Sequence, residues 1–239
     1  MAIYKPVKKW LLPLLSIVIG LSIGYALFLS KEDYQYSQWV TLLEDNETRM
    51  YQIESAYKWD NKVYSESQGV WSEENSYYQI TTPISDGDEF SFDAYVFEEQ
   101  FYLKSSGHWF VGTFPHSFTE ELAPLDNPFK WTVDLLKHAE QITKDKNGDH
   151  ITYKAIFKAF PSIDFRGTLL SKQDDTYLEM NFKRGEPFSL EWVVNPVHPD
   201  SLGPLVSYPE TLTYHLFFDT NKDAVPALPE EAEKAEEID

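Results

Sequence analysis

The chain has 239 residues, with 20 Lys and Arg against 39 Asp and Glu, which gives a formal net charge of −19 at pH 7. This acidic balance excludes nucleic acid and anionic lipid headgroups as partners of the general surface, because polyanions are repelled. The chain contains no cysteine, so neither a disulfide framework nor a lipid-modified cysteine is available. Aromatic residues make up 16% of the sequence, which favours strands over helices.

An uncharged apolar run occupies residues 10–30, behind a basic leader that contains Lys5, Lys8 and Lys9. At 1.5 Å per residue the run reaches about 31 Å, enough for the hydrocarbon core of a bilayer. We therefore predict one transmembrane helix, an uncleaved signal-anchor, with residues 1–9 in the cytoplasm by the positive-inside rule. The remaining chain is then extracytoplasmic on the cell membrane, and export without disulfides suggests a bacterial cell envelope.

Two features of this run leave alternatives open. Gly24-Tyr25-Ala26 could serve as a cleavage site, so a secretory signal peptide is the competing interpretation. Ser16, Gly20 and Gly24 recur every four residues, a spacing that lets a second membrane helix approach closely. This spacing predicts a homodimer or a membrane-protein partner. The alternative is that the small residues recur there by coincidence.

Downstream of the run, residues 31–225 are predicted to form one extracytoplasmic domain, since no linker or repeat divides them. An amphipathic helix is predicted around Tyr36, Trp39 and Leu43, whose spacing places them on one helix face. From residue 50, short runs rich in Tyr, Phe, Val, Ile and Thr alternate with turn residues, as in an antiparallel meander. Its clearest hairpin joins residues 101–104 to 108–111, with Gly107 supplying the positive φ of the turn.

A second helix should begin at Asn127-Pro128, an N-cap acceptor followed by proline, and continue until Asn147-Gly148. Its apolar stripe consists of Trp131, Leu135, Ala139 and Ile142. Strands are then predicted over residues 151–159, 176–183, 188–194 and 212–218, from apolar alternation. Residues 226–239 carry six carboxylates and one lysine and are predicted to be an acidic flexible tail. Helix, meander, helix and meander together define an α+β fold class.

This order carries a family resemblance over roughly residues 50–160. The hairpin FEEQFYLKSSGHWFVG, the segment NPFKWTVDLLKHAEQI and the strand NGDHITYKAIFKAF resemble those of lipoprotein-carrier (LolA-like) and LprG-like envelope proteins. The resemblance implies a curved antiparallel β-sheet, a half-barrel, with covering helices on its concave side. It also implies an apolar groove that holds acyl chains and no catalytic residues. Those proteins are usually soluble or anchored through cysteine, so a retained membrane helix would make this chain a tethered lipid handler.

Apolar side chains on these elements are candidates for lining such a groove, although an aromatic stripe is also typical of a core. The candidates are Phe101, Leu103, Trp109, Trp131, Leu135, Phe157 and Trp192. Burial of each methylene of an acyl chain contributes about 0.8 kcal/mol, so binding would need no catalytic group.

No motif predicts catalysis, a metal or a cofactor. The histidines are isolated, GxSxG and glycine-rich phosphate loops are absent, and pairs such as Glu73-Glu74 arise by chance among 39 acidic residues. Asp219, Asn221 and Asp223 have the spacing of a calcium loop, but Ala224 stands where its sharp turn requires glycine.

We therefore predict a non-enzymatic, membrane-tethered envelope protein that binds a lipid, a lipoprotein or another apolar ligand in a groove. The alternative is a structural or regulatory subunit that holds a partner in an envelope complex through its transmembrane helix and one domain face. A wall or sugar hydrolase would need two carboxylates about 5 to 10 Å apart in a cleft, which only a structure can reveal.

Overall fold

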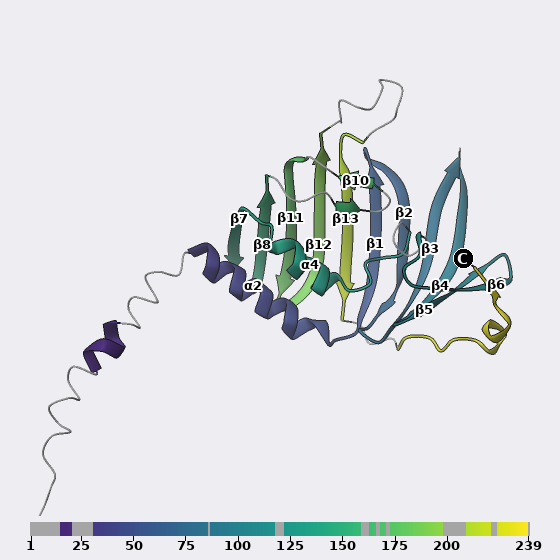
Figure 1. Ribbon diagram of the computed structural model, residues 1–239, viewed down its shortest axis with the longest axis horizontal. Coiled ribbons are helices and arrows are strands. Elements are labelled where there is room, and N and C mark those ends of the chain that lie inside the picture. The colour runs from purple at the N-terminus through teal and green to yellow at the C-terminus, as the bar shows by residue number, and fades with distance from the viewer. Residues whose placement is uncertain are drawn as a thin grey trace, which may run out of the picture.

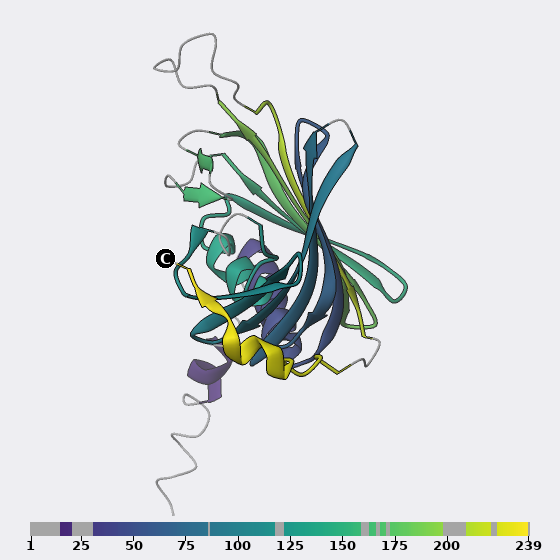
Figure 2. The same ribbon diagram turned by 90° about the vertical axis from the view of Figure 1, so that its right-hand side faces the viewer.

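The computed structural model describes residues 15–20, 31–85, 87–117, 122–158, 163–165, 168–170, 173–197, 209–220 and 224–238. In this part of the chain, twelve strands form one open sheet in the order β14-β6-β5-β4-β3-β2-β1-β13-β12-β11-β8-β7 (Figure 1). Neighbouring strands are antiparallel, except that β14 runs parallel to β6. The sheet twists so strongly that its two ends cross in the side view (Figure 2).

The sheet is built almost entirely from neighbours in the sequence, as expected of a meander. Its first half consists of β1 (Tyr51–Trp59), β2 (Lys62–Trp71), β3 (Asn75–Ser85), β4 (Asp88–Phe97), β5 (Gln100–Ser105) and β6 (His108–Thr113). Its second half consists of β7 (Gln141–Asn147), β8 (His150–Phe157), β11 (Gln173–Lys183), β12 (Glu186–Pro196) and β13 (Leu212–Asp219). A separate ribbon pairs β9 (Ile163–Phe165) with β10 (Thr168–Leu170). Pairing of β1 with β13 joins the two halves.

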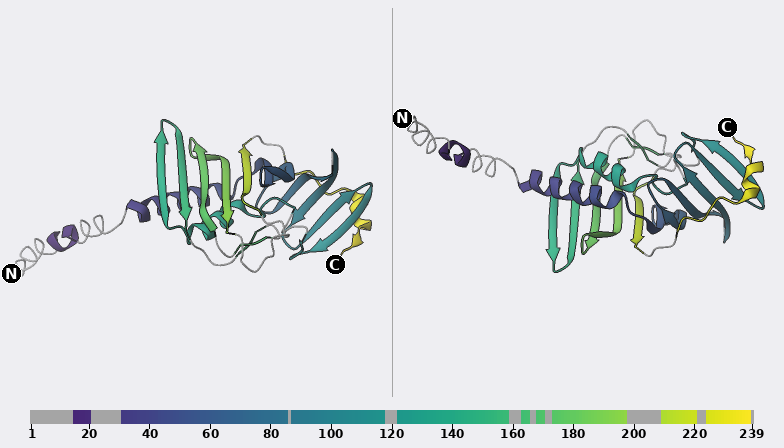
Figure 3. Two further views of the ribbon diagram at one scale, coloured as in Figure 1. Left: turned by 90° about the horizontal axis from the view of Figure 1, so that it is seen from above. Right: turned by 90° about the horizontal axis from the view of Figure 1, so that it is seen from below.

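Both long helices lie on the same face of the sheet, called the inner face below (Figures 2 and 3). They are α2 (Lys31–Glu47) and α4 (Pro128–Leu136). The amphipathic spacing predicted for α2 is confirmed, because Trp39 and Leu43 are fully buried and Trp39 stacks on Tyr153 with ring centroids 5.2 Å apart. The start of α4 is also confirmed, since the Asn127 side chain accepts hydrogen bonds from two backbone N–H groups in its first turn.

The prediction that the second helix continues until Asn147 is wrong, because α4 ends at Leu136. The chain then enters β7, which begins where the Glu140 N–H donates to the Ile156 carbonyl over 2.9 Å. Pairing with β8 satisfies the backbone of β7 and buries Ile142. The helical spacing of Ala139 and Ile142 with α4 was therefore overridden by strand pairing, a tertiary interaction that local pattern does not encode.

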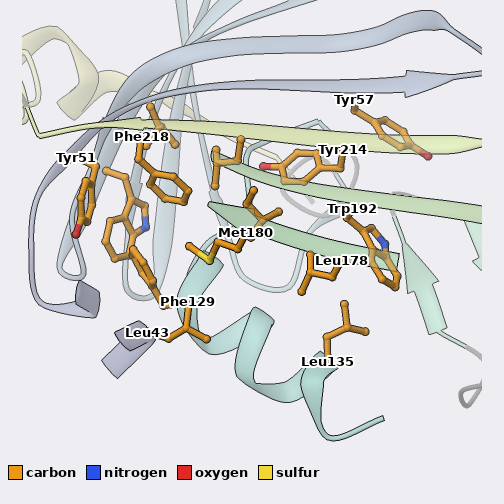
Figure 4. Close-up of a cluster of buried hydrophobic side chains, with 14 of the residues drawn as sticks. Leu43, Tyr51, Tyr57, Phe129, Leu135, Leu178, Met180, Trp192, Tyr214 and Phe218 are labelled. Atoms are coloured by element: carbon orange, nitrogen blue, oxygen red, sulfur yellow. The ribbon is translucent and has the colours of Figure 1, made fainter. Parts of the chain in front are cut away.

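The core lies between the inner face and the two helices and is rich in aromatic rings (Figure 4). Tyr51 of β1 contacts Phe129 of α4 and Phe218 of β13, with ring centroids 5.7 and 5.5 Å apart. Offset and edge-to-face pairs of this kind stabilise by about 0.5–1.5 kcal/mol beyond the area they bury. The aromatic excess of the sequence is thus used to attach the helices to the sheet.

Residues 226–239 were predicted to be an acidic flexible tail. In the structure Glu230–Lys234 form a 3₁₀ helix, η1, and Glu236–Glu237 form β14, which pairs with Phe110 and Val111 of β6. Ala232 of η1 is buried at 1% exposure in a small cluster with Tyr95 and Trp109. The segment therefore lies over the β6 edge and the neighbouring outer face, where its charged side chains can remain in water.

Two predictions about the architecture are wrong. The fold class is not α+β with a half-barrel behind a transmembrane helix but one large open sheet with few helices. No helix in the described ranges is both long and apolar enough to cross a bilayer. Of the predicted span 10–30, residues 15–20 are described and are helical, and the other residues lie outside the described ranges.

The predicted location, single-pass in the cell membrane, is also not supported, because it depended on that transmembrane helix. Ser16 and Gly20 lie within residues 15–20, whereas Gly24 falls outside the described residues.

Candidate binding site on the inner face

Six of the seven predicted groove residues belong to the main core cluster, and Trp109 belongs to a separate small cluster. Trp131, Phe157 and Trp192 come together, since the Trp192 ring lies 5.8 Å from that of Trp131 and 5.2 Å from that of Phe157. Leu135 extends from α4 toward the same part of the sheet (Figure 4). All four belong to the main core cluster.

Of the other three predicted groove residues, Phe101 and Leu103 belong to the same core cluster, whereas Trp109 does not. Phe101 and Leu103 are on β5, six strands from β12, which corresponds to about 29 Å across the sheet. Trp109 is in the outer-face cluster covered by Ala232. The group around Trp192 is the start of a candidate site, and whether all seven residues line one groove stays a prediction.

Strand register extends this group into a continuous row of inner-face side chains. Leu178, Trp192, Tyr214, Tyr57 and Ser65 lie opposite one another in turn on β11, β12, β13, β1 and β2. We call these five residues the inner row. Trp192, Tyr57 and Tyr214 have essentially no exposed surface. The backbone N–H of Leu125 donates to the Tyr214 hydroxyl over 3.2 Å, so the segment before α4 covers the middle of the row.

The inner row ends where β2 and β3 separate. Their ladder runs from Trp71–Ser76 to Glu66–Thr81 and continues no further in the described structure. Above this rung, residues 62–65 of β2 still pair with β1, and residues 82–85 of β3 still pair with β4. We call this interval the split, and in Figure 1 the upper ends of the two strands stand apart there.

Two side chains of the sheet, Gln173 and Thr82, have buried polar groups without a hydrogen-bond partner among the described residues. Gln173, at the start of β11, is only 4% exposed, and neither its amide oxygen nor its amide nitrogen is bonded. The hydroxyl of Thr82, at the split, is also buried and unbonded. An unsatisfied buried polar group costs about 1–3 kcal/mol, so such groups are uncommon in folded proteins.

Burial raises the pKa of two tyrosines of the inner face, Tyr153 and Tyr78. Desolvation raises the pKa of Tyr153 to about 12 and raises the pKa of Tyr78 further. Both hydroxyls therefore remain protonated and act only as hydrogen-bonding groups at physiological pH. In the described residues no cluster of three or more His, Asp or Glu side chains could hold a metal ion. The inner row thus offers apolar surface and neutral polar groups.

The outer face has a different character. A hollow of about 490 Å³ lies over β1, β2 and β3 and is lined by Glu54, Glu66, Gln68, Gln79 and Glu89 among others. Within it, the Gln68 side-chain amide donates to that of Gln79 over 3.0 Å. Beside it, His215 lies 3.6 Å from Glu191, and burial lowers the pKa of this histidine. This surface is polar and solvated, unlike the inner row.

Sequence reasoning missed Gln173, Ser65, Thr82 and the split. One signal was available for the split, namely Pro83 within the strand-like run QITTPIS. Proline has no N–H to donate and is confined to unpaired strand edges or bulges. No sequence signal marked Gln173, because its lack of a partner depends on which groups the fold brings near it.

The chain was compared with known proteins. No protein-family profile and no curated protein sequence matches it. Among solved structures it is similar to LprF from Mycobacterium bovis, with 7% identity over 80% of this chain and 97% of that chain and a TM-score of 0.45. It also matches the DNA polymerase sliding clamp from Pseudomonas aeruginosa, with 8% identity over 81% of this chain and 63% of that chain and a TM-score of 0.15. Likeness at these scores establishes neither a family nor an activity.

Proposed function

We propose that the protein is a non-catalytic binding protein for an acyl-chain lipid or another apolar ligand that carries a small neutral polar group. The single observation that carries this proposal is Gln173, whose buried amide has no partner among the described residues. A ligand with a hydroxyl, ester or amide group would satisfy both the donor and the acceptor of this side chain. Binding would thereby offset the desolvation of the amide.

The surroundings of Gln173 suit the apolar part of such a ligand. Gln173 lies opposite Pro196 on β12, four residues from Trp192, which corresponds to about 13 Å along the strand. Trp131, Phe157 and Trp192 supply large rigid surfaces at that distance. Each methylene that leaves water for such surroundings contributes about 0.8 kcal/mol. An amphiphile could therefore place its polar group at Gln173 and its chain along the inner row.

The charge of the chain narrows the ligand class. With a net charge of −19 the protein repels anions at long range. No basic side chain belongs to the inner row, and its polar groups are neutral hydroxyls and an indole. A neutral acylglycerol therefore suits the inner face better than an anionic phospholipid.

Substitution of Gln173 by leucine separates a binding role from a structural one. Gln173→Leu removes an unpaired buried amide, so we expect the ligand-free protein to gain about 1 kcal/mol in free energy of unfolding. The same variant should bind monopalmitoylglycerol at least about tenfold more weakly, which corresponds to 1.4 kcal/mol. Calorimetric titration and chemical denaturation measure the two effects.

The matched control is Gln68→Leu, which changes the same residue type on the exposed outer face. This variant should leave monopalmitoylglycerol affinity unchanged. Equal affinities of wild type and Gln173→Leu, or a wild type that does not bind the lipid, would count against the proposal.

A further inference from the structure

The split between β2 and β3 shows two coordinated departures from regular strand geometry. Between Tyr57–Ser65 and Lys58–Val63 the register shifts, so Tyr64 is an extra residue in β2. Between Pro83–Glu89 and Ser85–Asp88 it shifts again, so Ile84 is an extra residue in β3. β-Bulges bend strands and re-aim side chains, and they are concentrated at sheet edges and functional sites. Two bulges on facing strands account for the separation.

The bulged residues place apolar side chains on the rim of the split. Ile84 is 65% exposed and Tyr64 is 37% exposed. Phe90 of β4, opposite Thr82 in the ladder, is a third exposed apolar residue there. Single exposed apolar residues are ordinary, but these three come from β2, β3 and β4 beside one interruption of the sheet, and we call them the apolar rim.

The rim connects directly to the inner row. The Tyr64 ring contacts that of Tyr57 in an edge-to-face arrangement, with centroids 5.5 Å apart. Ser65 is the last member of the inner row, and Thr82, with its unbonded hydroxyl, is the residue that would face it across the split if the ladder continued. Hollows flank both sides: one is lined by Glu66, Thr81 and Glu89, the other by Val63 and Tyr64.

We propose that the split is the route by which an acyl chain reaches the inner row. This inference rests on the proposed function and specifies where the ligand passes. A peptide strand is a poorer occupant than an acyl chain, because Pro83 cannot donate a hydrogen bond to an added strand. An acyl chain requires no backbone partners and gains from the apolar rim instead.

Cysteine cross-linking tests the route, because the chain has no cysteine of its own. In the double variant Tyr64→Cys, Ile84→Cys, a short bismaleimide would bridge the rim. The control is Gln68→Cys, Gln79→Cys, which bridges directly opposed residues of the same two strands below the split. The readout is the rate at which bound fluorescent monoacylglycerol is displaced by unlabelled monopalmitoylglycerol.

We expect the rim bridge to slow displacement on the order of tenfold or more, and the control bridge to leave the rate unchanged. Equal rates for both bridged proteins and the unbridged protein would overturn the route while leaving the proposed function intact. Failure of the unbridged protein to take up the fluorescent lipid would overturn both. A second variant, Ile84→Asp, needs no cross-linker: its side chain is largely exposed, so the fold should persist while lipid uptake slows.

Discussion

The lower and upper parts of the β2–β3 pair differ sharply in how the two strands meet. In the lower part, six rungs pair Glu66–Trp71 with Ser76–Thr81, and a Cβ on Gly69 would lie 1.9 Å from the carbonyl oxygen of Tyr77. In the upper part the strands carry one bulge each and do not pair. The comparison shows that two strands can be fixed by close backbone approach at one end of a pair and remain unpaired at the other end.

Substitution of Gly69 should disrupt the pairing of β2 with β3 below the split. An alanine Cβ at this position would collide with backbone atoms of Tyr77 and Tyr78, which cannot move aside as a flexible side chain could. We expect Gly69→Ala to lower the free energy of unfolding by more than about 3 kcal/mol. Denaturant unfolding measures the loss.

Gln68→Ala, one residue away and exposed on the outer face, should change stability by no more than about 0.5 kcal/mol. Similar stabilities of the Gly69 and Gln68 variants would show that the strands do not approach closely at this rung.

Two isoleucines on β3 sharpen the comparison because only their place in the strand differs. Ile80 is fully buried below the split, whereas Ile84 is 65% exposed at its rim. Ile80→Ala should cost about 2–5 kcal/mol through lost burial and a cavity, and Ile84→Ala should cost less than about 0.5 kcal/mol. Thermal unfolding of both variants checks the difference. A large loss for Ile84→Ala would mean that the upper part is packed rather than open.

The smallest effect is expected at Thr82. Its hydroxyl is buried and unbonded, so Thr82→Val removes an unsatisfied group with little change in shape. We expect stability to stay the same or rise by up to about 1 kcal/mol. A loss above about 1 kcal/mol would indicate that the hydroxyl has a partner in solution, and the interpretation of the split as open would then be weakened.

The sequence pattern correctly predicted those elements whose structure depends on nearby residues. The N-cap at Asn127 and the amphipathic face of Trp39 and Leu43 depend only on neighbours within a few turns, and both are confirmed. The positive φ at Gly107 in the β5–β6 turn is confirmed for the same reason. The end of α4 could not be predicted, because pairing of Gln141–Asn147 with β8 overrides a helical spacing.

The arrangement of the sheet could not be predicted, because it depends on long-range pairing. β1 and β13 join halves that are separated by about 150 residues, for example at Tyr57 and Tyr214, and no local pattern specifies such a pair. The predicted transmembrane helix over residues 10–30 is not supported either, since no helix in the described part of the chain is long and apolar enough to cross a bilayer.

The candidate site shows the same limit. The group of Trp131, Phe157 and Trp192 was predicted as ligand-lining from apolar faces, and the structure brings these three rings together. Whether they contact a ligand stays a prediction. Gln173 and the split were missed, since an unpaired amide and an interrupted ladder are properties of the assembled sheet.

The central claim, that the inner row holds an acyl-chain ligand, is tested most directly by the bound contents of the protein. The full chain, produced in bacteria and purified without detergent, would be extracted with organic solvent and the extract analysed by mass spectrometry beside that of Gln173→Leu. The account predicts acyl-containing compounds at a level approaching one per chain in the wild type, and a much smaller amount in the variant. A folded wild-type protein whose extract contains no acyl compound, and which takes up no monopalmitoylglycerol when it is offered, would contradict the account.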